Sequence, residues 1–190
     1  MQFSIPLPIQ KPESVWETYV PIVQSGSTYD TYLTDTIADP AEYSQLCHLL
    51  LHASDGFSIN IHLNTPGGNV DSAFMLIDAI KKSDAVVTAY CYGTVASAGT
   101  IIALSCDDLV IAPYTQFMIH NYSTGTQGKG HEVMSYINFN DAELKEAFAD
   151  IYLGFLTEDE MNTIIKGEDK WMGAKEVEQR WATIHESQHS

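Results

Sequence analysis

The sequence alternates strand-like segments with helix-like segments, and this alternation limits the possible folds more than any other feature. Residues 57–63 alternate apolar and polar side chains, as a strand with one covered face does, and residues 86–92 are rich in β-branched and aromatic residues. A helix-like pattern follows each of them, over 70–82 and over 97–104. Strands that alternate with helices form βαβ units, so we expect an α/β fold with a largely parallel sheet.

The rest of the chain completes this pattern within one domain. Thr157 and Glu160 have the spacing of a capping box, in which each side chain bonds the backbone N–H of the other residue. Three prolines in the first twelve residues disfavour a helix and indicate an extended arm over about 1–17. A length of 190 residues is typical of a single domain. The remaining expected elements are a helix over 39–54, strands over 108–112 and 116–120, a long helix over 131–153, and a helix from Thr157 to about residue 166.

Composition excludes several classes of partner. The chain has 25 acidic and 9 basic residues, a formal charge of -16, whereas nucleic acids and anionic membranes attract clustered lysine and arginine. No apolar run approaches the roughly 20 residues that cross a bilayer. Residues 1–6 lack the basic start and apolar run of a secretory signal, and three scattered cysteines form no disulfide framework. We therefore expect a cytoplasmic protein that binds neither nucleic acid nor membrane.

Three segments carry residues suited to acyl transfer. Ser97 stands among small residues in Gly-Thr-Val-Ala-Ser-Ala-Gly, His120 ends the run Phe-Met-Ile-His, and Pro66 precedes two glycines. A serine hydroxyl needs a base to take its proton, and the anion formed on attack needs fixed N–H donors. Each segment also has an ordinary structural explanation: a small packed residue, a core-edge histidine and a tight turn. The α/β-hydrolase pattern Gly-x-Ser-x-Gly is absent, because position 95 is valine.

Taken together and in order, these segments resemble the proteolytic subunit of the Clp protease. That family has a Ser-Pro-Gly-Gly turn, a Gly-x-Ala-Ala-Ser-Met-Gly segment, a Met-Ile-His segment, and an acid before an aromatic-led Ser-Ala-x-Glu-Ala stretch. The resemblance extends from about Ser58 to Val177. The matching segments of this chain are Thr65-Pro66-Gly67-Gly68, Gly93-Thr94-Val95-Ala96-Ser97-Ala98-Gly99, Met118-Ile119-His120 and Asp169-Lys170-Trp171-Met172-Gly173-Ala174-Lys175-Glu176-Val177.

The resemblance implies a fold and an active site. The fold is the ClpP/crotonase-like arrangement of ββα units, with a protruding handle over about 122–153. Ser97 is the implied nucleophile, His120 the base and Asp169 the acid that orients the imidazole. The backbone N–H groups of Gly68 and Ala98 hold the oxyanion. No cofactor and no metal are implied.

The same resemblance implies partners. We expect a homo-oligomer, a heptameric ring, that cleaves peptides or unfolded polypeptides and works with an AAA+ unfoldase driven by ATP. Glu168 stands where the family has an arginine that pairs between rings, which leaves the stacking of two rings open. Such departures suit a divergent member encoded by a bacteriophage, acting in the host cell as a capsid-maturation protease.

Other functions stay open on the residues alone. A crotonase-like acyl-CoA enzyme uses paired N–H groups without a serine–histidine pair, and a catalytically silent ring subunit contributes only structure. Lys129, Lys145, Lys166 and Lys170 are the alternatives for a serine–lysine dyad, but nothing in the sequence places any of them beside Ser97. His48 and His52 have the i, i+4 spacing of two metal ligands, but one helix face with two histidines explains them better, so no metal is predicted.

Overall fold

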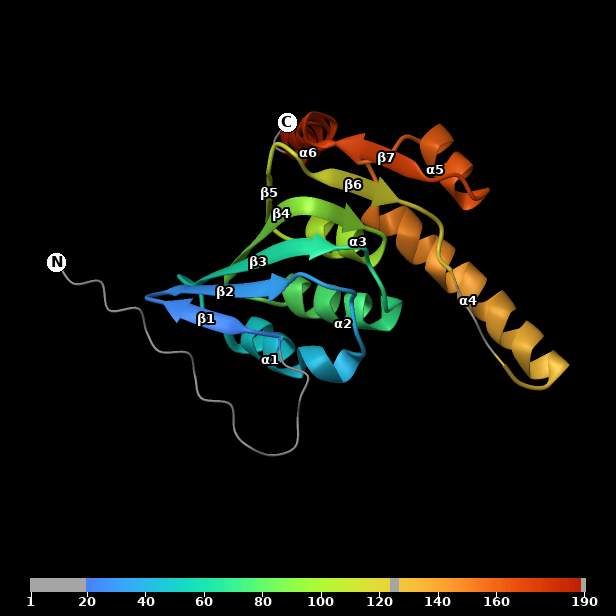
Figure 1. Cartoon of the computed structure of the whole chain (residues 1–190), viewed down its shortest axis with the longest axis horizontal. Coiled ribbons are helices and arrows are strands. Elements are labelled where there is room, and N and C mark those ends of the chain that lie inside the picture. Colours follow the sequence, from blue (N-terminus) through green and yellow to red (C-terminus); the bar gives the residue numbers. More distant parts are fainter. Residues whose placement is uncertain (1–19, 124–126, 189–190) are drawn as a thin grey trace.

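A seven-stranded sheet forms the centre of the fold (Figure 1). The structure is a computed structural model that describes residues 20–123 and 127–188, so the expected arm over 1–17 lies outside the described residues. The sheet order is β1-β2-β3-β4-β6-β7, and β5 pairs with β4 beside this path. The strands are β1 (Ile22–Ser25), β2 (Thr28–Leu33), β3 (Ser58–Thr65), β4 (Val86–Ala96), β5 (Asp108–Ile111), β6 (Gln116–Ile119) and β7 (Lys170–Gly173).

The centre of the sheet is parallel, as expected from the βαβ pattern. β2 pairs with β3, β3 with β4, and β4 with both β5 and β6 in parallel register. The two outer pairs, β1 with β2 and β6 with β7, are antiparallel. β1, β2 and β7 were not predicted, because these strands of four to six residues lack a long alternation and gain their stability from pairing.

The helices match the expected positions closely, with one correction at the first. The segment expected as a helix over 39–54 starts as a 3-10 turn, η1, and becomes α-helical only at Ser44. The helix after β7 was not predicted. The helical elements are η1 (Pro40–Tyr43), α1 (Ser44–His52), α2 (Val70–Lys81), α3 (Ala98–Leu104), α4 (Gly130–Ile151), α5 (Glu158–Ile165) and α6 (Ala174–Gln188).

One face of the sheet forms the core. β3 alternates as its sequence predicts: Ile59, Ile61 and Leu63 are fully buried, while Asn60 and His62 point to the other, half-exposed face. α1, α2 and α3 lie side by side along the buried face (Figure 1). This layer fixes the ends of β3 and β4, where the candidate residues lie.

The long helix α4 extends away from the sheet (Figure 1). None of its side chains is buried. Its position agrees with the protruding helix of the expected α/β fold. The helices in the described part of the chain include none with the length and apolar character that a bilayer span requires.

Candidate active site

A bend in β4 places Ser97 at the end of the sheet. The first half of β4 pairs with β5 and its second half with β6, and Gly93 lies between the two halves with a φ of 55°. The Asn64 side-chain oxygen accepts the Thr94 N–H at 3.1 Å across this bend. The predicted strand ends at Tyr92, where the run of β-branched and aromatic residues stops. Here the glycine bends the strand, and its second half continues to Ala96.

Ser97 has a strained backbone. Its φ of 53° and ψ of -124° make it the single non-glycine residue with positive φ in the described part of the chain. Such a conformation costs on the order of 1–3 kcal/mol and persists where surrounding bonds enforce it. The Ser97 N–H donates to the Met118 carbonyl at 2.8 Å, and the Ser97 carbonyl accepts from the Thr100 N–H at 2.9 Å and hydroxyl at 2.7 Å. The strand therefore turns sharply into α3 and presents the serine side chain.

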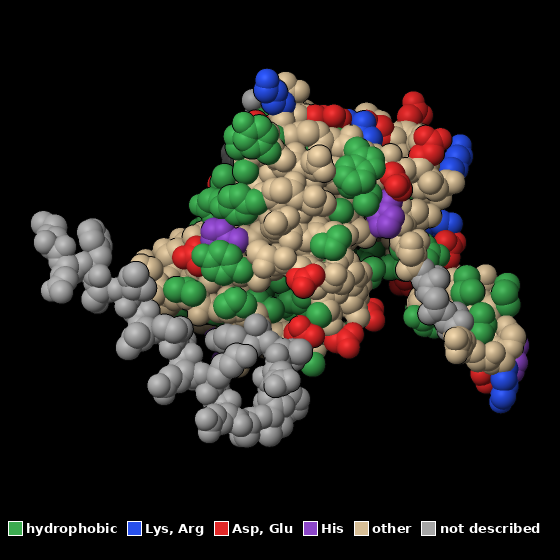
Figure 2. Space-filling model, viewed as in Figure 1, with side chains coloured by type: hydrophobic (Ala, Val, Ile, Leu, Met, Phe, Trp, Pro, Cys, Tyr) green, Lys and Arg blue, Asp and Glu red, His purple; other side chains and the backbone are tan. Residues whose placement is uncertain are grey.

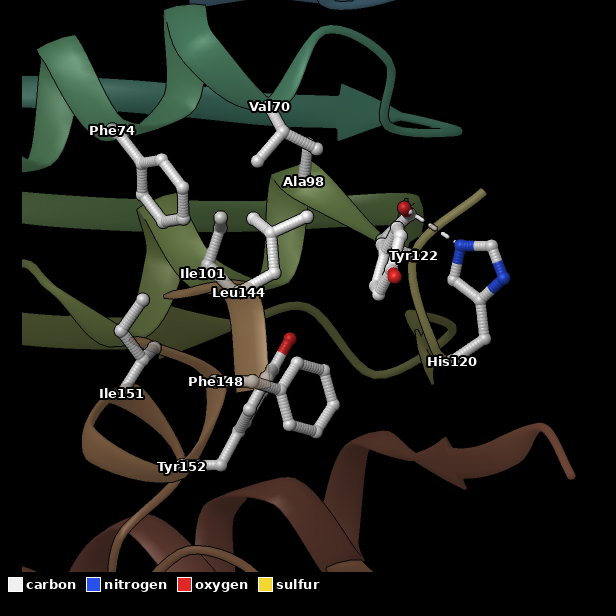
Figure 3. A pocket seen from close by; sticks show the side chains of 11 residues that line it. Val70, Phe74, Ala98, Ile101, His120, Tyr122, Leu144, Phe148, Ile151 and Tyr152 are labelled. Carbon is white, nitrogen blue, oxygen red and sulfur yellow. Dashed lines mark hydrogen bonds between the residues drawn. The ribbon is translucent and has the colours of Figure 1, made fainter. Parts of the chain in front are cut away.

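Ser97 and His120 are joined by a hydrogen bond. The distance from Ser97 Oγ to His120 Nε2 is 2.7 Å, shown by the dashed line in Figure 3. The pairing of β4 with β6 brings them together, because Ala96 lies opposite Met118 and each reactive residue follows just beyond that pair. Both residues are half-buried. A neutral imidazole with an unprotonated Nε2 can accept the serine proton in this arrangement.

The first of the two glycines after Pro66 packs directly against Ser97, and the second packs against Ile37. A Cβ atom on Gly67 would lie 2.6 Å from Ser97 Cβ and 3.0 Å from the Ala98 nitrogen. The turn is fixed from behind, since the Ile37 N–H donates to the Gly67 carbonyl at 2.8 Å. The N–H groups of Gly68 and Ala98 donate to no acceptor among residues 20–123 and 127–188. One free backbone donor, at Ala98, therefore directly follows the serine, and the other, at Gly68, belongs to the turn that packs against it.

Asp169 lies next to His120 but makes no bond to it. β6 and β7 pair Ile119 with Lys170, and continuing this register by one residue places Asp169 opposite His120. Asp169 is exposed, and neither its carboxylate nor His120 Nδ1 has a hydrogen-bond partner among the described residues. The structure thus joins two of the three expected residues and leaves the acid as an unbonded neighbour.

An ion network holds β7 in place beside this pair. Glu160 binds Arg180 at 2.7 Å and Lys170 at 2.9 Å, and Arg180 also binds Glu176 at 2.9 Å. The hydrogen bonds from Arg180 hold the pKa of Glu160 far below its usual range, against the opposing effect of partial burial. The Thr157–Glu160 capping box is confirmed, with both reciprocal bonds present. The network therefore ties α5 and α6 to the strand that follows Asp169.

We expect Glu160→Gln to lower the free energy of unfolding by about 1–3 kcal/mol at pH 7, because it removes a charged partner of Arg180 and Lys170. The folded pKa is depressed, so this stabilisation is present above the unfolded value of about 4.3 and is lost as pH falls below it. Thermal unfolding at pH 7 and at pH 3 measures the difference, which should shrink at the lower pH. Glu158→Gln, an exposed change on the same helix, is the control, and equal losses for both variants would contradict the prediction.

An apolar pocket opens beside Ser97. Its volume is about 50 Å³, and it is lined by side chains from two parts of the fold (Figure 3). This pocket was not predicted. A sequence pattern that could have indicated it lies on α4, where the apolar residues that line the pocket recur at i, i+4 and i+7. The main lining residues are Val70, Phe74 and Ile101 from α2 and α3, and Leu144, Phe148 and Ile151 from α4.

The two histidines considered as metal ligands both lie on α1. The His48 and His52 rings lie 4.4 Å apart on α1. Over residues 20–123 and 127–188, no group of three or more His, Cys, Asp or Glu side chains is arranged to hold a metal ion. Cys47, Cys91 and Cys106 are buried free thiols, and burial raises the pKa of each of them.

Comparison with known proteins agrees with this geometry. The Clp protease family model matches residues 27–179. The chain is 36% identical over 94 residues to ATP-dependent Clp protease proteolytic subunit 2 of Pseudomonas aeruginosa, covering 48% of this chain and 46% of that relative. It is 30% identical over 142 residues to proteolytic subunit 3 of Rhizobium meliloti, covering 70% and 69%, and 27% identical over 154 residues to proteolytic subunit 1 of Salinibacter ruber, covering 78% and 65%. Several matches, such as the first, span only about half of the relative's length. The family match over most of the chain shows that this protein belongs to the Clp protease family.

Proposed function

We propose that this chain is a serine endopeptidase that cleaves unfolded polypeptides through an acyl-enzyme on Ser97. The observation that carries the proposal is the 2.7 Å hydrogen bond between Ser97 Oγ and His120 Nε2. This pair lies at an apolar pocket, with one free backbone N–H group at Ala98 and another, at Gly68, in the turn that packs against Ser97. A nucleophile, a base, an oxyanion site and a side-chain pocket are the parts that peptide hydrolysis needs.

The geometry supports a defined sequence of steps. His120 Nε2 takes the proton as Ser97 Oγ attacks the peptide carbonyl carbon, and the N–H groups of Gly68 and Ala98 bind the resulting oxyanion. The imidazolium then gives its proton to the leaving amine, which breaks the C–N bond and leaves an ester on Ser97. Water, activated by the same imidazole, hydrolyses the ester and regenerates the serine. An apolar side chain of the substrate fits the pocket between α3 and α4.

Asp169 completes the proposed triad. Its position opposite His120 supports a role in which the carboxylate rotates and accepts a hydrogen bond from His120 Nδ1–H. Such a bond fixes the imidazole tautomer and stabilises the imidazolium. Because the acid is exposed and unbonded in the single chain, we propose that assembly into a ring closes this contact. Activity should then depend on the assembly state, and native mass spectrometry of active fractions tests this.

The hydrogen-bonded pair also weighs against the alternative enzyme class. An acyl-CoA enzyme of the crotonase type needs the paired N–H groups but no serine–histidine bond. A catalytically silent ring subunit needs neither the paired N–H groups nor the serine–histidine bond.

The ring of seven subunits, the AAA+ unfoldase partner and the capsid-maturation role remain predictions from the resemblance. Native mass spectrometry, with and without an added unfoldase and with capsid precursor as substrate, tests them.

Labelling with a fluorophosphonate probe tests the proposed function directly. The wild-type assembled protein should react covalently with one equivalent of probe per active subunit, and mass spectrometry should locate the adduct on Ser97. Ser97→Ala should abolish labelling, whereas the control Ser105→Ala should keep it, since that hydroxyl donates to the Ile101 carbonyl in α3. Labelling that persists in Ser97→Ala, or an unlabelled but folded oligomer, refutes the proposal.

A further inference from the structure

A side-chain hydrogen bond ties the middle of α4 to the segment that follows β6. The Tyr122 hydroxyl donates to Asp141 Oδ1 on α4 at 2.8 Å. Among the hydrogen bonds and ion pairs of residues 20–123 and 127–188, no other joins a side chain of α4 to a residue outside the helix and its N-cap. No side chain of α4 is buried. The orientation of the helix therefore depends on this bond, on the apolar contacts around the pocket, and on the buried C-cap Tyr152, whose hydroxyl is bonded to Thr100 Oγ1.

Tyr122 lies in the segment that carries His120. It comes two residues after the histidine, between β6 and α4. Asn121 fastens the same segment on the other side, because its amide donates to the Ile165 carbonyl at 3.0 Å and its oxygen accepts the Tyr122 N–H at 2.9 Å. The residues after His120 are thus fixed to α5 through Asn121 and to α4 through Tyr122.

Tyr122 also forms part of the pocket wall. It lines the same cavity as Ser97 and His120, together with Leu144 and Phe148 of α4 (Figure 3). The pocket has one wall on the body of the fold and one on α4, so its width depends on where α4 lies. A displacement of α4 would move one wall of the pocket relative to Ser97 and His120. Because Tyr122 is bonded to α4, the displacement would also shift the segment that carries His120.

Nearby charge keeps both partners of the Tyr122–Asp141 hydrogen bond in the required protonation states. Lys145 Nζ lies 2.7 Å from Asp141 Oδ2, and this hydrogen bond, with that from Tyr122, holds the pKa of Asp141 below its usual value. The bond to Asp141 raises the pKa of the Tyr122 hydroxyl. Asp141 therefore stays ionised and Tyr122 stays protonated between about pH 5 and 9, given their usual values near 3.9 and 10. The link is intact over the whole range in which a histidine base works.

We propose that Tyr122 is a positioning residue for the reaction at Ser97. Its hydroxyl, held by Asp141, sets the position of α4 relative to His120 and so aligns the reactive pair with the pocket. This inference rests on the proposed function, because it concerns the alignment of the same pair. Tyr122 lines the pocket but takes no part in the proton transfer between Ser97 and His120.

The test uses the assembled full-length protein and a fluorogenic peptide with an apolar residue before the cleaved bond. Tyr122→Phe keeps the ring on the pocket wall and removes only the bond to Asp141. We expect kcat to fall about 10-fold with KM changed less than about twofold, because small misplacements of reacting groups cost up to about 100-fold. The fluorophosphonate reaction rate should fall in parallel. The deficit should stay constant from pH 6 to 9, because the bond does not titrate there.

A double-mutant cycle separates this role from general stability. Asp141→Leu should reproduce the loss, Asp141→Asn should recover most of the activity because the amide oxygen still accepts, and the double variant Tyr122→Phe with Asp141→Leu should be no worse than either single change. The controls are Tyr114→Phe on an exposed turn and Glu146→Leu on α4, both exposed side chains.

The outcomes distinguish the inference from the proposed function. Wild-type kcat in Tyr122→Phe, additive losses in the double variant, or an equal loss in Tyr114→Phe would overturn the positioning role while Ser97-dependent hydrolysis stands. Hydrolysis that survives Ser97→Ala would refute the proposed function and this inference with it.

Discussion

Replacing Ser97 by alanine should reduce peptide turnover roughly a million-fold while leaving the fold intact, as deletion of a nucleophile does where a triad acts as a unit. The physical reason is the loss of the covalent route: without Oγ, His120 Nε2 has no hydroxyl to deprotonate at 2.7 Å. The pocket and the two free N–H groups remain, so substrate binding should change little. The effect is measured as kcat on a fluorogenic peptide, with KM compared separately.

Combined variants show whether the pair acts as one unit. His120→Ala should cost nearly as much as Ser97→Ala, and the double variant should be no slower than Ser97→Ala alone, because either change removes the same proton transfer. Ser105→Ala, at the C-cap of α3, is the matched control. Losses that multiply in the double variant would show that the two residues act independently and would contradict a shared mechanism.

Gly67→Ala should lower kcat by at least about 100-fold, comparable to the loss of an oxyanion donor. The added Cβ would lie 2.6 Å from Ser97 Cβ and 2.7 Å from the Ala96 carbonyl oxygen, so the turn or the serine must move. Either movement displaces the Gly68 N–H from the serine. The φ of 94° at Gly67 adds backbone strain, since side chains rarely adopt it. Peptide kinetics and the rate of fluorophosphonate labelling measure the loss.

Gly56→Ala is the control that separates the effect of backbone strain from the effect of a steric clash with the added Cβ. Gly56 has a similar φ of 88°, but a Cβ there would meet no atom within 4 Å. It should therefore lose about 1–2 kcal/mol of stability from the left-handed conformation and keep full activity. If Gly67→Ala keeps wild-type kcat, or if Gly56→Ala loses as much activity as Gly67→Ala, the glycine turn is not part of an oxyanion site.

Sequence reasoning located most of the elements around the candidate site. The alternation in β3 and the helix that begins at Val70 came from local patterns, and the structure confirms both with boundaries shifted by one or two residues. The capping box at Thr157 was predicted for the same reason, since capping depends on residues three apart. These features are local, and short-range side-chain preferences suffice to find them.

Several of the missed features depend on distant partners. β7 is a strand because β6 is available to pair with it, and the bend at Gly93 exists because β4 exchanges β5 for β6 along its length. The pocket was missed since its walls come from α2, α3 and α4. The role expected of Asp169, the acid of the triad, also depends on a distant residue, His120. This role remains a prediction, because Asp169 follows the register toward His120 but makes no bond to it.

The sequence by itself determined the α/β class and the order of the motifs, and it supplied the candidate residues of the site, because periodicity and residue type are properties of short segments. Only the tertiary structure decided that the Ser97 hydroxyl and the His120 ring, 23 residues apart along the chain, come within 2.7 Å of each other. It also decided that a strained turn presents the serine and that one tyrosine ties α4 to the histidine segment. Distances between residues far apart in the chain follow from strand pairing and packing, which no local pattern records.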